Sequence, residues 1–78
     1  MVGKRLRSLR MKNKLTQQKV ADALVISLNA YQKYEQGERF PSLEMLVKLA
    51  DMFHAPTDFI LGRDDYLRSL GVSVDEFL

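Results

Sequence analysis

Cysteine is absent from the 78-residue chain, which excludes disulfides and metal sites built on thiolates. No stretch approaches the roughly 18 consecutive apolar residues that a membrane-spanning helix needs. Histidine occurs once, as His54, and gives little material for acid–base catalysis. No segment alternates polar and apolar residues for long enough to form a sheet, so no glycine-rich phosphate loop follows a strand.

These absences leave little support for an enzyme. Asp64 and Asp65 are adjacent carboxylates, but neighbouring residues on a helix point apart. We therefore expect this pair to begin a solvated helix rather than to act as acid and base. Metal ligands would have to converge from separate helices. We expect no catalytic residue, no metal site, no cofactor and no small-molecule ligand.

The chain is long enough for one hydrophobic core and too short for two. Its hydrophobic share of 46% and its charged share of 28% are ordinary for a globular protein. So short a chain builds a modest core, so its stability must come from helix packing, with a partner subunit as a second source. The basic N-terminus leads into a charged helix rather than an apolar signal segment, so we expect a cytoplasmic protein.

The net charge of +2 conceals an uneven distribution. Residues 1–41 hold nine Lys and Arg against three acidic residues, a net charge of +6, whereas residues 42–78 hold three against seven, a net charge of −4. A basic front half and an acidic back half suggest one face for a polyanion and another face for something else. An accidental asymmetry of a solvated surface is the alternative explanation.

Apolar residues recur at helical spacing throughout the chain, which predicts an all-α fold. We expect five helices, at about residues 3–12, 17–24, 28–36, 43–53 and 58–61. Thr16, Ser27 and Ser42 precede three of them as N-cap residues. Asn13 is expected to end the first helix in the left-handed conformation. The apolar face of the fourth helix comprises Leu43, Leu46, Val47, Ala50 and Phe53.

Residues 1–62 form the predicted five-helix domain, and residues 63–78 form a short helical extension. The extension is too apolar to be a disordered linker. It either packs back on the helices or meets a second copy of the chain. Because the basic front half must stay free, we expect a homodimer interface at Tyr66, Leu70, Val72, Val74 and Phe77.

The second and third helices are separated by a turn of about three residues, which predicts a helix-turn-helix. In such pairs the second helix enters the major groove of DNA. If Ile26, Tyr31 and Tyr34 face inward, the outward side chains of the third helix are Leu28, Asn29, Gln32 and Lys33. Asn and Gln pair with adenine, Lys reaches guanine, and Leu contacts a thymine methyl group. A core or dimer contact is the alternative role for Leu28.

Groups suited to phosphate surround this helix. The N-termini of the second and fourth helices carry unpaired backbone N–H groups and the positive end of the helix dipole. Such contacts fix the register of a protein on DNA without reading sequence. The residues assigned to phosphate binding are Thr16, Gln17, Ser27, Arg39 and Ser42.

From about Val2 to Leu61 the sequence resembles the lambda-repressor/Cro-like helix-turn-helix family, whose members are often called XRE-type regulators. The most specific elements are Thr16-Gln17, Ala21, and Glu35-x-Gly37-x-x-x-Pro41-Ser42. Repressors of this family exemplify the docking geometry in which the second helix of the pair lies in the major groove. The resemblance implies five helices, a dimer on a two-fold symmetric operator in double-stranded DNA, and transcriptional control by repression, exerted by a nucleoid-associated protein.

Residue by residue, the resemblance implies that Gln17 bridges a phosphate and the recognition helix. It also implies a structural ion pair between Arg10 and Glu35, which would join the first helix to the end of the third. Two positions depart from the family pattern. Val25 stands where the family usually has Gly in the turn, and Lys14 stands where the family favours Gly. A β-branched residue suits a positive φ poorly, so the turn has a different geometry or carries strain.

The main alternative keeps the fold but acts through a protein partner, as an antitoxin or an anti-repressor-like adaptor would. The acidic, apolar extension favours that alternative. The outward face of the third helix decides between the two, because three of its four side chains are polar and suit base edges. The sequence therefore favours DNA.

Overall fold

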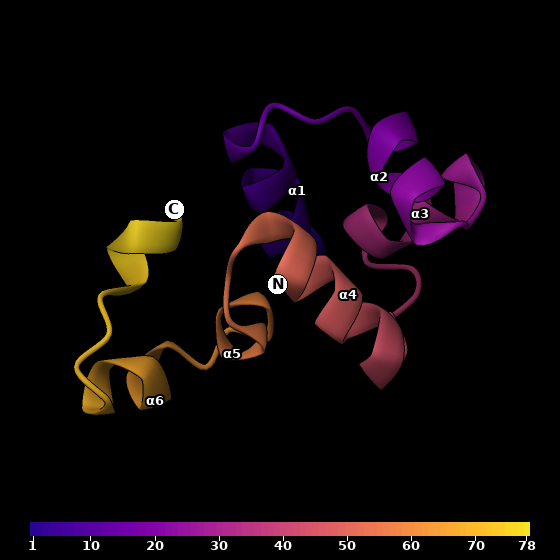
Figure 1. Cartoon of the computed structure of the whole chain (residues 1–78). Coiled ribbons are helices and arrows are strands. Elements are labelled where there is room, and N and C mark those ends of the chain that lie inside the picture. The colour runs from indigo at the N-terminus through magenta and orange to yellow at the C-terminus, as the bar shows by residue number, and fades with distance from the viewer.

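The computed structural model describes residues 1–78 and contains only helices (Figure 1), so the predicted all-α fold is confirmed. None of these helices is long and apolar enough to cross a membrane. The six α-helices and one 3₁₀-helix are α1 (Val2–Lys12), α2 (Gln17–Leu24), α3 (Leu28–Gln36), α4 (Leu43–Phe53), α5 (Thr57–Ile60), α6 (Asp64–Ser69) and η1 (Val74–Phe77).

Three hydroxyl side chains begin the central helices, as the sequence predicts. The hydroxyl oxygens of Thr16, Ser27 and Ser42 accept hydrogen bonds, at 3.0–3.1 Å, from the backbone N–H three residues later. Each bond satisfies one of the N–H groups that a helix leaves unpaired in its first turn. The starts of α2, α3 and α4 are therefore determined by local sequence.

The prediction that Asn13 takes the left-handed conformation is wrong. Asn13 has a φ of −86°, and Lys14 takes the left-handed conformation instead, with a φ of 57°. The Asn13 side-chain amide donates to the carbonyl oxygen of Leu9 at 2.7 Å, which holds Asn13 against the last turn of α1. The reversal therefore occurs at Lys14, the position where the resemblance implies glycine.

The turn between α2 and α3 keeps a left-handed residue although it has no glycine. Val25 is the C-cap of α2, with φ 58° and ψ 45°, and its side chain is 90% exposed. The backbone N–H groups of Val25 and Ile26 donate to the carbonyls of Asp22 and Ala21. Val25 thus has the backbone conformation that a glycine would adopt in this turn. As a β-branched residue at positive φ, it is strained.

We expect Val25→Gly to stabilise the domain by about 1 kcal/mol. Relief of the strain, on the order of 1–3 kcal/mol, outweighs the larger chain entropy that glycine has in the unfolded state. No packing is lost because the valine side chain is exposed. Urea denaturation of the variant measures the change. Val25→Ala is the matched control because it removes the branching and keeps the Cβ, so it should recover only part of the gain; a destabilised Val25→Gly protein would contradict the expectation.

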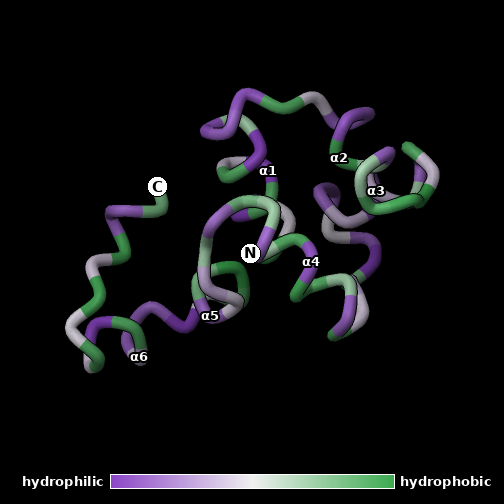
Figure 2. Tube along the Cα trace, in the orientation of Figure 1, coloured by the Kyte–Doolittle hydropathy of each residue, from purple (hydrophilic) through white to green (hydrophobic).

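One cluster of sixteen buried residues forms the core, and it draws on every helix. Figure 2 shows hydrophobic and hydrophilic residues interleaved along the chain, which is typical of helices that bury one side. The cluster consists of Leu6, Leu9, Val20, Ala21, Leu24, Tyr31, Tyr34, Leu46, Leu49, Ala50, Phe53, Ala55, Phe59, Ile60, Leu67 and Val74.

The face of α4 differs from the prediction at two positions. Leu46, Ala50 and Phe53 are buried, but Leu43 is 83% exposed and Val47 is 51% exposed. The first turn of α4 extends beyond the neighbouring helices (Figure 1), which leaves Leu43 at its start on the surface, whereas Met45 and Leu46 of the same turn still pack against the core. Two apolar residues expected in the core are therefore on the surface.

Helices α1 and α3 approach each other very closely at Gly3. A Cβ atom built on Gly3 would lie 2.3 Å from the carbonyl oxygen of Glu35 and 2.8 Å from that of Tyr34. Only a residue without a side chain fits there. Gly3 therefore sets how near the first helix comes to the end of α3.

The extension 63–78 packs back on the helices that precede it. Leu67 and Val74 are part of the core, and the Phe77 ring lies 5.3 Å from that of Phe59, centroid to centroid. Arg5 joins α1 to α6 through two hydrogen bonds to the Asp64 carboxylate, at 2.8 and 3.1 Å. The extension is thus part of the same folded unit.

This packing involves three of the five residues predicted for a dimer interface. Val74 is buried within its own chain, and Val72 and Phe77 are partly buried against the core, so these three offer little surface to a second copy. Only Tyr66 and Leu70 of that set are exposed, at 43% and 59%. The Arg63 guanidinium covers the Tyr66 ring at 4.4 Å. Periodicity could not show this, because the inward face of the extension depends on contacts with distant residues.

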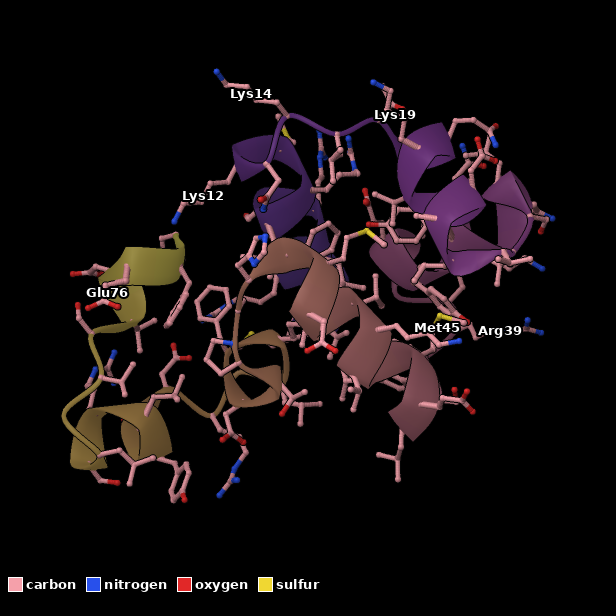
Figure 3. All side chains as sticks on the ribbon, viewed as in Figure 1. Lys12, Lys14, Lys19, Arg39, Met45 and Glu76 are labelled. Carbon is pink, nitrogen blue, oxygen red and sulfur yellow. The ribbon has the colours of Figure 1, made fainter.

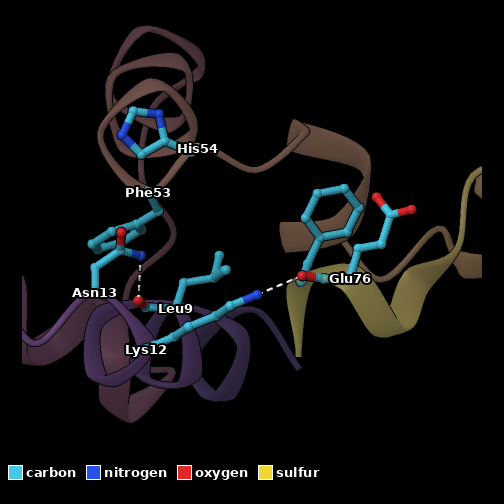
Figure 4. A pocket seen from close by; sticks show the side chains of 7 residues that line it. Leu9, Lys12, Asn13, Phe53, His54 and Glu76 are labelled. Carbon is cyan, nitrogen blue, oxygen red and sulfur yellow. Dashed lines mark hydrogen bonds between the residues drawn. The ribbon is translucent and has the colours of Figure 1, made fainter.

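A cavity of about 270 Å³ lies between the ends of α1 and α4 and the last turn of the chain (Figure 4). Lys12 spans one side and donates to the backbone carbonyl of Glu76. His54, the C-cap of α4, lines the other side in a left-handed conformation. The contact ties the C-terminal turn to α1.

Candidate nucleic-acid interface

Helix α3 has one face in the core and one face toward solvent. Tyr31 is fully buried and Tyr34 is 8% exposed. Their rings pack edge to face, with 6.3 Å between the ring centroids. Ile26, in the preceding turn, is partly buried against the core. These three residues face inward, as predicted, and they fix the rotation of α3 about its own axis.

The four side chains predicted to face outward from α3 lie outside the core, and Gln36 at the end of the helix is exposed as well. Asn29 is exposed, and Leu28, Gln32 and Lys33 are partly exposed. Leu28 lies outside the core cluster, so the alternative role as a core contact has no support. The face presents two amides and one ammonium group around an apolar side chain, a set that matches the donor and acceptor pattern of base edges.

A chain of hydrogen bonds links this face to the interior. Gln32 Nε2 donates to Gln17 Oε1 at 3.1 Å, and Gln17 Nε2 donates to Glu35 Oε1 at 3.1 Å. Glu35 in turn accepts two hydrogen bonds from the Arg10 guanidinium, at 2.7 and 3.2 Å. Arg10 also donates to the carbonyl of Leu15, just before α2. The network connects α1, α2 and α3 and holds Gln17 and Gln32 in place.

The Arg10–Glu35 ion pair is largely shielded from water, with side-chain exposures of 14% and 4%. Burial by itself would raise the pKa of Glu35, but hydrogen bonds from Arg10 and Gln17 hold that pKa below its ordinary value. The same pair raises the pKa of Arg10, chiefly through the hydrogen bond to Glu35. Both groups are therefore charged at neutral pH, and the pair is a fixed structural element.

Tyr31 lies beside this pair with its hydroxyl group buried and without a hydrogen-bond partner of good geometry. Burial raises the pKa of Tyr31, and the nearby Glu35 carboxylate raises it further. The phenol therefore stays protonated, and its role is to fill the core under α3.

The residues predicted for phosphate contacts lie at helix starts and in the loop that follows α3. Thr16, Ser27 and Ser42 use their hydroxyl oxygens to cap their own helices. The groups that remain available to a phosphate at these helix starts are therefore unpaired backbone N–H groups. Arg39 makes no ion pair within the chain and points outward (Figure 3). Gln17 belongs to the hydrogen-bond network.

Two cations were missing from the predicted set. Lys14 and Lys19 flank the N-terminus of α2 and extend into solvent on the same side of the molecule (Figure 3). Lys14 lies two residues before the Thr16 cap and Lys19 three residues after it, so their closeness to a predicted helix start could have identified both from the sequence. Both side chains add positive charge beside the start of α2.

The chain matches the model of a helix-turn-helix family over residues 6–60. It is 38% identical over 64 residues to the HTH-type transcriptional regulator ImmR of Bacillus subtilis, covering 82% of this chain and 50% of ImmR. It is 42% identical over 62 residues to the CTXphi transcriptional repressor RstR of Vibrio cholerae (80% and 55%). It is 47% identical over 60 residues to the regulator AnsR of Bacillus subtilis (77% and 52%).

The chain spans about half the length of these curated relatives. No solved structure matches it. The matched residues run from Leu6 in α1 to Ile60 at the end of α5, and so include the whole α2–α3 pair and the network that supports it. The chain therefore belongs to the XRE-type, lambda-repressor/Cro-like family of helix-turn-helix proteins.

Proposed function

We propose that this chain is a sequence-specific DNA-binding regulator of transcription, which places α3 in the major groove of a palindromic operator and binds there as two copies. The relatives named as transcriptional regulators and repressors support regulation. The observation that carries the proposal is the outward face of α3, where Gln32 is held by Gln17 while Asn29 remains free beside it.

Base reading is assigned to Leu28, Asn29, Gln32 and Lys33. Positioning on the phosphates is assigned to the N-termini of α2, α3 and α4, at Thr16, Gln17, Ser27 and Ser42, and to the side chain of Arg39. This division follows the physics of DNA recognition, in which contacts to the backbone set register and contacts to base edges set sequence.

The test is selection of duplexes from a random pool, followed by fluorescence-anisotropy titration at several salt concentrations. We expect enrichment of a palindrome bound on the order of 10³-fold more tightly than unrelated duplex. Weak binding to every duplex that vanishes near physiological salt would refute the proposal. It would show that the basic face acts only through charge and would favour a protein partner, as in an antitoxin or an adaptor.

Asn29→Ala and Arg39→Ala should separate the two kinds of contact. We expect Asn29→Ala to weaken binding to the selected operator by about 1–3 kcal/mol and to leave binding to unrelated duplex almost unchanged. Arg39→Ala should weaken binding to all sequences alike and reduce the slope of log affinity against log salt by about one. Equal effects of the two substitutions on both duplexes would show that Asn29 does not read a base.

A further inference from the structure

The cavity of about 270 Å³ lies apart from the proposed DNA-binding face. Three segments that are distant in the sequence line it, namely the end of α1, the end of α4 and η1 (Figure 4). None of the residues assigned to base reading or to phosphate contacts is among them. The sequence predicts no small-molecule ligand, because the cavity exists only where these three segments meet.

The floor of the cavity is apolar. Leu9 and Phe53 belong to the core, and the Phe77 ring, packed against Phe59, forms a wall beside them. Leu9 and Phe53 are only 1% and 3% exposed, so the apolar surface within reach of a ligand is small. Ligand sites in proteins typically have volumes of about 300–1,000 Å³, so this cavity suits a molecule with one ring or a short branched chain.

A cation stands at the edge of this apolar floor. The Lys12 side chain is exposed, and its ammonium group donates to the backbone carbonyl of Glu76 (Figure 4). An ammonium group has three N–H donors, so two remain for another acceptor. No ion pair neutralises Lys12, and the Glu76 carboxylate points away from it (Figure 4). The charge of Lys12 is therefore available to an anion in the cavity.

The side of the cavity opposite to η1 consists of His54 and Asn13 (Figure 4). The hydrogen bond from the Asn13 amide to the carbonyl oxygen of Leu9 fixes the Asn13 side chain, so this part of the wall is rigid. His54 follows α4 in a left-handed conformation, with a φ of 53°, and places a flat ring at the mouth. This side therefore offers a planar surface and no acidic group.

The helix ends that line the cavity oppose an anion, but only weakly. The C-terminal end of a helix has about half a negative charge, and both α1 and α4 end here. Carbonyls in the last turns of both helices are already paired, since Arg10 accepts from the backbone N–H of Leu15 and Ala50 accepts from that of Ala55. Lys12 has a full positive charge with donors to spare, so it decides the sign of the ligand.

We propose that the cavity binds a small organic carboxylate that has an apolar body. The carboxylate accepts hydrogen bonds from the Lys12 ammonium group, and the apolar body lies over the floor between Phe77 and His54. A phosphate group fits less well, because it has a second negative charge and no apolar part to cover the floor. The occupant would join the end of α1 to η1, and so would hold the extension against the helix-turn-helix domain.

Amide chemical shifts of the full chain, followed during titration with benzoate at constant ionic strength, test the site. We expect saturable shifts confined to the ends of α1 and α4 and to η1, with a dissociation constant of about 1 mM or tighter. Benzyl alcohol and benzylamine have the same ring with a neutral and a positive group, and each should bind at least about tenfold more weakly. Equal or tighter binding of either would overturn the assignment of a carboxylate. Shifts that never saturate, or that spread over the whole basic front half, would overturn the site itself.

Lys12→Met keeps the stem of the side chain and removes its charge, so it should weaken benzoate binding at least about tenfold. Its affinity for benzyl alcohol should not change, because the floor and walls remain. Lys14→Met, which removes an exposed lysine outside the cavity, is the matched control and should leave benzoate binding unchanged. Equal losses in the two variants would overturn the proposal. A parallel loss of benzyl alcohol binding in Lys12→Met would show that Lys12 only holds the C-terminal turn, which would also overturn it.

His54→Gly tests the wall without risk to the fold, because the left-handed conformation of His54 suits glycine. We expect it to weaken benzoate binding about twofold to tenfold, since one face of the ligand ring loses its contact. Unchanged affinity would show that the ligand does not lie between Phe77 and His54. None of these measurements includes DNA, so their failure would leave the proposed function as it stands.

Discussion

Replacing Gly3 with alanine should destabilise the protein by about 2–3 kcal/mol or more. In an ordinary helix the same change stabilises by roughly 0.5–1 kcal/mol, because alanine loses less entropy on folding. Here the new Cβ would lie 2.3 Å from the carbonyl oxygen of Glu35, and that neighbour is helix backbone that cannot rotate away. Helix α1 must therefore move off α3, which loosens the contacts of Leu6 as well. A loss of stability in Gly3→Ala would therefore indicate that α1 and α3 approach closely at this residue, whereas an ordinary helical glycine would give a gain.

Urea denaturation followed by circular dichroism measures this change. Ser8→Ala is the matched control, because Ser8 lies on the exposed face of the same helix and alanine should be neutral or slightly stabilising there. A stability of about 4–12 kcal/mol is typical for a chain of this length, so the loss is a large share of the total. Stability equal to or above that of the wild type in Gly3→Ala would show that α1 does not pack against α3 as described.

Removing Arg10 from its buried pair with Glu35 should destabilise the protein by about 3–5 kcal/mol. Arg10→Met keeps most of the apolar stem and removes the charge. It leaves a carboxylate that is 4% exposed and no longer has a cation beside it. The double variant Arg10→Met/Glu35→Gln removes both charges and should recover a large part of the loss. Denaturation of the three proteins at neutral pH measures the effect.

The pH dependence of stability separates the loss of the ion pair from a simple packing defect. In the wild type the pKa of Glu35 is below 4.5, so its contribution is present above pH 4.5 and is lost as the pH falls toward the depressed value. In Arg10→Met, burial dominates and the pKa of Glu35 rises, so protonation on acidification restores stability. The two curves should converge as the pH falls. A constant difference between pH 7 and pH 4 would show that the charge of Glu35 is not the cause.

The sequence predicted the features that short segments determine. The three hydroxyl caps and the start and end of α2 and α3 follow from residues within one helical turn, which is why Thr16, Ser27 and Ser42 were identified. The outward face of α3 follows from its period, with Tyr31 and Tyr34 inward. Asn13 shows the limit of such signals. Asparagine tolerates the left-handed conformation, but the Asn13 side chain instead donates a hydrogen bond to the carbonyl oxygen of Leu9. The next residue, Lys14, takes the left-handed conformation.

The features that the sequence could not predict depend on contacts between distant segments. Gly3 looked like any residue near a chain end, and its role appears only when α1 meets the backbone at the end of α3. The bond from Gln32 to Gln17 needs the relative placement of two helices. The burial of Val74 and the exposure of Leu43 depend in the same way on which helices end near them. A helical period identifies an apolar face but not the neighbour that covers it.

The bond between Gln32 and Gln17 also bears on the thermodynamics of recognition. Fixing a flexible side chain on binding costs about 0.5–1.5 kcal/mol in lost rotamer freedom. Gln32 has already lost part of that freedom in the free protein, because Gln17 and, behind it, Glu35 and Arg10 restrain it. Asn29 is exposed and keeps its rotamer freedom in the free protein. If α3 reads bases as proposed, the two neighbouring amides would differ in kind: Gln32 would meet a base pair with a geometry set in advance, whereas Asn29 could adapt to more than one.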